Sequence, residues 1–216
     1  MNNYNYKISN GLRNNVLEYI YHKRTCNANF TVIDVGGSMN GWSSQYVDAI
    51  VDFNDFPIAE HKIKHFKCDI THPDSWTEIL QYIEDNGKFD FCICTHTLED
   101  IMNPVYVSEQ ISKIAKEGYV AVPSKHRELS RNIEGKYRGY IHHRWIFDVV
   151  DNIFFGYPKI NYLDSTDIFD LIANSDENIS DLSFFWKNKI DIVYINDNYL
   201  GPCVNSVISY YNNLLK

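Results

Sequence analysis

The sequence predicts an α/β protein built on a doubly wound, mostly parallel sheet. Short apolar segments alternate along the chain with segments of helical periodicity, an order typical of parallel sheets. Three of the apolar segments carry an aspartate at or near their end, and ligands of such sheets collect beyond the carboxyl ends of the strands. These three predicted strands are residues 31–35, 49–52 and 65–70.

The first predicted strand leads into a glycine-rich turn, Gly36-Gly37-Ser38-Met39-Asn40-Gly41. Glycines let the backbone approach a ligand closely and adopt conformations that side chains forbid. A dinucleotide site has the pattern G-x-G-x-x-G, but Ser38 stands at its middle glycine and Asp34 would face the phosphates. A negative charge disfavours a pyrophosphate and favours an ammonium group.

The other elements of the first half follow in order. Apolar residues at helical spacing predict helices at about Asn10 to His22 and at Asp74 to Asn86. A fourth strand, a helix and a fifth strand are predicted at residues 89–95, 103–116 and 118–124. The alternation of strand and helix therefore extends to Ser124.

After Ser124 this alternation ends. Residues 125–139 are charged and predict a surface loop or irregular helix over the mouth of the pocket. Residues 144–157 fit either a helix or a hairpin turning at Asp151-Asn152, and the hairpin is favoured. A helix at Ser165–Ala173 and one or two strands within Leu182–Ile195 complete the predicted elements.

The ordered segments from about residue 30 to 125 resemble class I S-adenosylmethionine-dependent methyltransferases. Asp34-Val35-Gly36-Gly37 is similar to the first motif of that family, and His96-Thr97-Leu98-Glu99 to the segment after its fourth strand. The resemblance implies a Rossmann-like seven-stranded sheet with helices on both faces, and a C-terminal hairpin or insert over the active site. It implies S-adenosylmethionine as cofactor and S-adenosylhomocysteine as product.

We therefore expect a single domain with an N-terminal helical region (1–29), a cofactor-binding half (30–124) and a substrate-binding half (125–216). The resemblance places Asp34 near the methionine ammonium, Asp52 on the ribose hydroxyls and Asp69 near the adenine. The expected cofactor-binding residues are Asp34, Gly36, Gly37, Ser38, Asp52, Phe53, Asp69, Ile70, Thr95 and His96.

An imidazole suits the removal of a proton from a hydroxyl acceptor. The candidate bases are His142, His143 and His96. If residues 140–147 are extended, Tyr140, His142 and Arg144 share one face and His143 shares the other with apolar residues. His142 is then the preferred base. Residues expected to bind the acceptor are Ser124, Glu128, Arg138, Tyr140 and Arg144, with the two arginines able to pair with phosphates.

No metal is expected, because the fourth strand ends in Thr95-His96 and not in an acid. A metal-assisted variant stays open, since some related enzymes polarise a diol with a divalent cation. In that variant His96, Glu99, Asp100, Glu128 and His142 would converge on the ion.

The acceptor class rests on resemblance alone. The Val122-Pro123-Ser124 strand end, Glu128 and the His142-His143-Arg144-Trp145 segment are similar to small methyltransferases found among glycan-assembly enzymes. A sugar hydroxyl is therefore expected as acceptor, most concretely on a nucleotide-activated deoxysugar or a glycan. The alternatives are an RNA or protein methyltransferase, a catalytically silent cofactor-binding module that regulates a partner, and a dinucleotide oxidoreductase.

Composition limits the partners. The 216-residue chain has 28 acidic against 20 Lys and Arg residues, and it has no basic cluster, which argues against extended nucleic-acid binding and against DNA. No apolar run reaches the length of a membrane span, so we expect a cytoplasmic protein without membrane insertion. Five scattered cysteines are expected to be reduced. A homodimer is compatible with the sequence, which does not define the oligomeric state.

Overall fold

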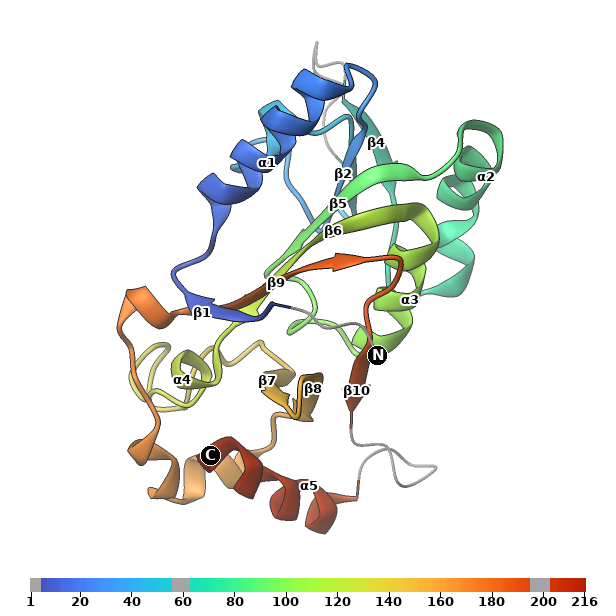
Figure 1. The fold of residues 1–216 in the computed structure, drawn as a ribbon. Helices are drawn as coiled ribbons and strands as arrows, with labels where there is room; N and C mark the ends of the chain where they lie inside the picture. Colours follow the sequence, from blue (N-terminus) through green and yellow to red (C-terminus); the bar gives the residue numbers. More distant parts are fainter. Residues whose placement is uncertain (1–4, 56–62, 195–202) are drawn as a thin grey trace.

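The computed structural model describes residues 5–55, 63–194 and 203–216 (Figure 1). They form a seven-stranded sheet with the order β1-β9-β6-β5-β2-β3-β4 and a three-stranded sheet with the order β10-β8-β7. The strands are β1 (Lys7–Ser9), β2 (Val32–Val35), β3 (Ala49–Asp52), β4 (Lys64–Lys67), β5 (Phe89–Thr95), β6 (Ala115–Pro123), β7 (Trp145–Val150), β8 (Ile153–Pro158), β9 (Asp181–Lys187) and β10 (Ile192–Tyr194).

Five central strands of the large sheet, from β6 to β4, are parallel. Strand β9 runs antiparallel to β6, and β1 pairs in turn with β9. This arrangement confirms the predicted mostly parallel sheet of seven strands. The short strand β1 was not predicted, because three residues without an apolar run give no strand signal.

Helices cover both faces of the large sheet, as predicted (Figure 1). Along β2, Val32 packs on the face covered by α1, whereas Ile33 packs on the face covered by α2 and α3. This alternation is the period of two that a strand imposes. The helices are α1 (Arg13–Cys26), α2 (Thr77–Asn86), α3 (Pro104–Ile114), α4 (Lys125–Glu128) and α5 (Val204–Tyr210).

Short 3-10 turns supplement these helices, and within the described ranges no helix is long and apolar enough to cross a bilayer. The turns are η1 (Ser44–Tyr46), η2 (Pro73–Trp76), η3 (Asn161–Ser165), η4 (Ile168–Leu171), η5 (Glu177–Ile179) and η6 (Tyr211–Leu215).

Local sequence signals explain where the helices begin and end. The Asn103 side chain accepts a hydrogen bond from the backbone N–H of Tyr106, and Pro104 follows at the first helical position of α3. Both are favoured at helix starts. Gly87 ends α2 with a φ of 82°, a conformation that glycine adopts without strain.

The predicted hairpin at residues 144–157 is confirmed. Strands β7 and β8 pair antiparallel, and the two turn residues Asp151 and Asn152 have φ values of 51° and 61°. Positive φ at both central residues is typical of the hairpin turn that matches the strand twist. The hairpin packs Phe147 and Phe154 into the core beneath the large sheet.

The predicted helix at Ser165–Ala173 is wrong. The segment forms only the end of η3 and the single turn η4. The Thr166 carbonyl accepts hydrogen bonds from Arg131 and Arg138, so it is not available to a continuous helix. The predicted closing strands at 182–195 are confirmed as β9 and β10, apart from Ile195, which lies outside the described residues.

Gly118 on β6 allows β9 and β5 to pack tightly around it. A Cβ added there would lie 2.7 Å from Trp186 Nε1 and would also meet the Cys92 carbonyl. We therefore expect Gly118→Ala to lower the free energy of unfolding by about 1–3 kcal/mol, measured as a shift of the urea midpoint. The exposed Ser209→Ala is the control, and equal midpoints for the two variants would contradict the packing argument.

Candidate functional site

The carboxyl ends of β2, β3, β4 and β5 meet around a cavity of about 350 Å³, here called the strand-end cavity. Parallel strands end at one edge of a sheet, which is why residues far apart in sequence converge there. Six of the ten residues expected to bind a cofactor line this cavity, and Asp34, Gly37, Ser38 and Thr95 do not. The six are Gly36, Asp52, Phe53, Asp69, Ile70 and His96.

The turn after β2 requires glycine at position 36. Gly36 has a φ of 78°, and a Cβ there would collide with the Thr97 side chain. Thr97 follows β5 and donates a hydrogen bond to the Thr95 carbonyl at 3.1 Å. The turns after two neighbouring strands therefore pack against each other, and bare backbone forms this wall of the cavity.

Asp34 lies behind the glycine-rich turn and lines neither this cavity nor the larger one described below. It is only 3% exposed, and the Ser43 hydroxyl donates a hydrogen bond to its carboxylate. Burial raises the pKa of Asp34 to about 7; the Ser43 hydrogen bond lowers it and the charge of Asp52 raises it. Asp34 therefore stabilises the glycine-rich turn through Ser43. Its carboxylate is not exposed to either cavity.

The carboxylates of Asp52 and Asp69 are held at the cavity wall by neighbouring residues. Asp52 Oδ1 accepts hydrogen bonds from the backbone and side chain of Asn54. Asp69 Oδ1 accepts two from Thr71, and these hydrogen bonds lower the pKa of Asp69. The side chain of Phe53, which is 66% exposed, stands beside them. The wall thus offers oriented acceptors next to an accessible aromatic ring.

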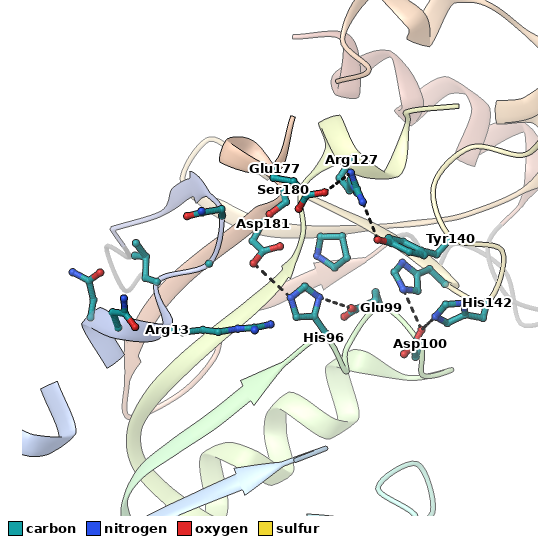
Figure 2. A pocket seen from close by; sticks show the side chains of 17 residues that line it. Arg13, His96, Glu99, Asp100, Arg127, Tyr140, His142, Glu177, Ser180 and Asp181 are labelled. Carbon is teal, nitrogen blue, oxygen red and sulfur yellow. Dashed lines mark hydrogen bonds and ion pairs between the residues drawn. The ribbon is translucent and has the colours of Figure 1, made fainter. Parts of the chain in front are cut away.

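A larger cavity of about 810 Å³, here called the outer cavity, meets the strand-end cavity at His96 and Asp100, which line both (Figure 2). Its walls come from the start of α1, the turn after β5, the loop before β7 and the segment leading into β9. The expected site residues that line it are His96, Tyr140, His142 and His143.

His96 stands between two carboxylates at this junction. Its Nδ1 lies 3.4 Å from Glu99 Oε1, and its Nε2 lies 3.5 Å from Asp181 Oδ2 (Figure 2). Burial lowers the pKa of His96, but the hydrogen bonds and charges of Asp181 and Glu99 outweigh burial and raise it to about 10. The imidazole is therefore charged at neutral pH and is not in the form that accepts a proton.

Asp100, His142 and His143 form a second cluster on the wall of the outer cavity. The Nε2 atoms of His142 and His143 lie 3.8 and 3.7 Å from Asp100 Oδ1. The expectation that the two imidazoles point to opposite faces is wrong, because Ile141 and His142 form a turn and not a strand. The ring centroids lie only 4.5 Å apart, and His142 is the more exposed of the two.

Glu128 contacts His143 at Nδ1, the ring nitrogen that faces away from Asp100. Its buried carboxylate lies 2.6 Å from His143 Nδ1 and 2.8 Å from Lys159 Nζ. Glu128, which was expected to bind the acceptor, does not line the outer cavity. Its position fixes the imidazole so that Nε2 points towards Asp100.

Three other expected acceptor-binding residues also have structural partners and do not line the outer cavity. Ser124 caps α4 by accepting from the Arg127 N–H. Arg138 is fully buried and donates to the carbonyls of Leu129, Leu163 and Thr166, so it is unavailable to a phosphate. Arg144 donates from Nε to the Asp100 carbonyl at 2.9 Å and steadies the turn after β5.

Sequence reasoning missed Arg13, Arg127 and Asp181, which line the outer cavity. Arg127 Nη2 donates to the Tyr140 hydroxyl at 3.1 Å (Figure 2). Arg127 adjoins Glu128 in a segment that was noted as charged, and that charge was the available signal. The pairing of β1 with β9 brings the chain before Arg13 to the cavity, and the pairing of β9 with β6 places Asp181 there; no local pattern indicates either pairing.

No protein-family model and no curated protein matches the chain. Among solved structures, it is similar to the methyltransferase domain of the bacterial protein CtHen1-CN, with 10% identity over 82% of this chain and 100% of that one, at a TM-score of 0.42. A cyclopropane-fatty-acyl-phospholipid synthase-like protein from Lactobacillus casei has 9% identity over 84% and 96%, at a TM-score of 0.38. A Thermoplasma acidophilum protein has 12% identity over 82% and 98%, at 0.31. Likeness at these scores does not bear on function.

The buried Asp34 carboxyl gives a prediction about stability and pH. Its pKa lies above the ordinary value of 3.8, at about 7, so the folded protein binds this proton more tightly than the unfolded chain. Its contribution to stability is therefore present below pH 3.8 and is lost as the pH rises to about 7. We expect Asp34→Asn to remove this loss, which amounts to roughly 2.5 kcal/mol between pH 5 and pH 8.

The measurement is urea denaturation of both proteins without ligands at pH 5 and pH 8. Asn keeps an acceptor for the Ser43 hydroxyl, so the variant isolates the charge. If the free energy of unfolding falls equally in the wild type and the variant between pH 5 and pH 8, Asp34 is not protonated in the folded protein at pH 5.

Proposed function

We propose that the protein transfers a methyl group from S-adenosylmethionine to a hydroxyl oxygen of a sugar, most concretely of a nucleotide-activated sugar or a glycan. The observation that carries this proposal is the meeting of two cavities at His96 and Asp100. Methyl transfer is an in-line displacement, so it needs two ligands brought end to end in one fixed orientation.

The strand-end cavity suits the cofactor. Asp52 would accept hydrogen bonds from ribose hydroxyls, and the exposed ring of Phe53 beside Asp69 and Ile70 would contact the adenine. The backbone of Gly36 permits close approach at the centre. The methyl-bearing sulfur would then lie towards His96, at the border with the outer cavity.

The outer cavity suits a polar acceptor. Tyr140 and the carboxylates of Asp100 and Asp181 offer acceptors and donors for hydroxyl groups, while Arg13 and Arg127 supply positive charge. The two arginines take over the phosphate-binding role that the sequence analysis gave to Arg138 and Arg144. An anionic group on the acceptor would be bound by them.

In the proposed transfer one bond forms, one bond breaks and one proton leaves. The hydroxyl oxygen forms a bond to the methyl carbon, the carbon–sulfur bond breaks with its electron pair left on sulfur, and the hydroxyl proton departs. The imidazoles of His142 and His143 promote this loss in one of two ways: they accept the proton at Nε2, or they hold a cation that lowers the pKa of the hydroxyl.

Three other functions compete with this proposal. An RNA or protein acceptor would use the same cavities, although the excess of eight acidic residues disfavours RNA. A silent module that regulates a partner would bind the cofactor and modify nothing. Preference for NAD over S-adenosylmethionine in a binding assay would instead support a dinucleotide oxidoreductase.

The direct test is mass spectrometry of reactions containing the protein, S-adenosylmethionine and a panel of nucleotide sugars. We expect one acceptor to gain a single methyl group, with formation of S-adenosylhomocysteine. Cofactor binding without any modified sugar would argue against this acceptor class and favour a larger acceptor or the silent module.

Asp52→Ala should weaken S-adenosylmethionine binding by about 10- to 100-fold, because it removes a charged hydrogen-bond acceptor for the ribose. Isothermal titration calorimetry measures the change. Asp85→Ala on the exposed surface of α2 is the matched control. Equal affinities of the two variants would remove Asp52 from the cofactor site.

His142→Ala should leave cofactor affinity unchanged and lower turnover by about 10²- to 10⁴-fold. The side chain is 58% exposed, so its removal does not threaten the fold. His22→Ala, on the exposed side of α1, is the control. Full turnover by His142→Ala would exclude its imidazole from the reaction.

A further inference from the structure

We propose that Asp100, His142 and His143 bind one divalent first-row cation at the wall where the two cavities meet. The binding site follows from the side-chain geometry alone, and only the role of the ion rests on the proposed function. No metal is expected from the sequence, because the fourth strand does not end in an acid. The acid comes later, at Asp100, in the turn after that strand.

The three side chains present their ligand atoms to one point. Asp100 Oδ1 and one nitrogen of each imidazole all lie within 4.8 Å of one another. The Nε2–Oδ1 distances of 3.8 and 3.7 Å are too long for hydrogen bonds. Two ligands of one tetrahedral ion lie about 3.4 Å apart, and the two Nε2–Oδ1 distances exceed this separation by only a few tenths of an ångström.

Asp100 Oδ1 has no other partner in the described part of the chain. The atom is shielded from solvent and accepts no hydrogen bond there. A buried acceptor without a donor is costly, and a cation between it and the two imidazoles would satisfy it. The neighbouring Glu99, which is 1% exposed, belongs to the same turn, and its Oε1 lies 3.4 Å from His96 Nδ1.

Each imidazole has a carboxylate near its Nδ1, the nitrogen that faces away from Asp100. Glu128 Oε1 lies 2.6 Å from His143 Nδ1, and Glu134 Oε2 lies 3.6 Å from His142 Nδ1. Metal-ligating histidines are typically oriented in this way, with one nitrogen facing a carboxylate and the other the ion. In particular, a carboxylate accepts, so Nδ1 of His143 is the donor in the Glu128 contact, and Nε2 is the nitrogen that faces Asp100.

Two imidazoles and one carboxylate are a donor set that suits Zn²⁺, Mn²⁺, Fe²⁺ or Co²⁺. Three protein ligands would leave further positions open to a ligand, and all three residues line the outer cavity. An acceptor with two neighbouring hydroxyls could fill them. The ion would lower the pKa of the bound hydroxyl, its proton would pass to solvent water, and the oxygen would attack the methyl carbon as the carbon–sulfur bond breaks.

The test is binding of Mn²⁺ to chelator-treated, desalted protein without cofactor or acceptor. Free Mn²⁺ is counted by electron paramagnetic resonance. Mn²⁺ is the probe because five free cysteines, of which Cys26 is exposed, would attract softer metals. We expect one Mn²⁺ per chain, affinity at least tenfold weaker in Asp100→Asn and in His142→Ala, and no change in His22→Ala.

Both test side chains are partly exposed, at 39% and 58%, so both variants should fold. Absence of Mn²⁺ binding by the wild type, or equal affinity in all variants, would overturn the site. Glu128→Gln, which alters a positioning residue, should weaken Mn²⁺ binding by about 10- to 100-fold while circular dichroism stays native. Unchanged affinity in a folded Glu128→Gln protein would refute its orienting role.

Failure of this inference is distinguishable from failure of the proposed function. Tight Mn²⁺ binding that depends on Asp100, with no methyl transfer to any sugar, supports the metal site and counts against the proposed acceptor. Methyl transfer that persists in EDTA overturns the catalytic role of the ion and leaves the proposed function standing.

Discussion

The burial of one carboxylate, that of Glu128, determines how the candidate site is assembled. A buried charge is tolerated only with charged, hydrogen-bonded partners, and Glu128 finds them in Lys159 at the end of β8 and in His143 in the preceding loop. Gly139 packs against it so closely that a Cβ would collide with it. Three separate stretches of the second half of the chain are thereby fixed relative to one another.

This constraint explains why an irregular segment can carry a defined site. The loop between α4 and β7 has no continuous ladder of hydrogen bonds, apart from the single bridge between Arg131 and Arg138. Its conformation is instead held by the buried charges of Glu128 and Arg138, each with several partners. The parallel sheet contributes the opposite wall, where Asp100 and His96 follow β5.

The elements around the strand-end cavity could be predicted from the sequence, whereas the side-chain directions around the outer cavity could not. Strands β2, β3 and β5 are local apolar runs, and the glycine turn and the aspartates after them are fixed by adjacent residues. His142 and His143 were recognised as candidates, but their directions depend on a turn at Ile141 that strand alternation cannot predict. An arginine such as Arg138 is the residue type expected to bind a phosphate. Only the tertiary structure shows that its guanidinium donates hydrogen bonds to backbone carbonyls instead.

The pairing of β1 with β9 has a consequence for the order in which the molecule is assembled. Lys7 lies opposite Ser183, so β1 must stay unpaired until β9 has left the ribosome. Contacts of such high sequence separation form slowly, because loop closure must precede them. Residues 10–15, which follow β1, are then placed late against the outer cavity, whereas the strand-end cavity depends on neighbouring segments synthesised together. The nascent protein would therefore form its two cavities one after the other, with the outer cavity completed last.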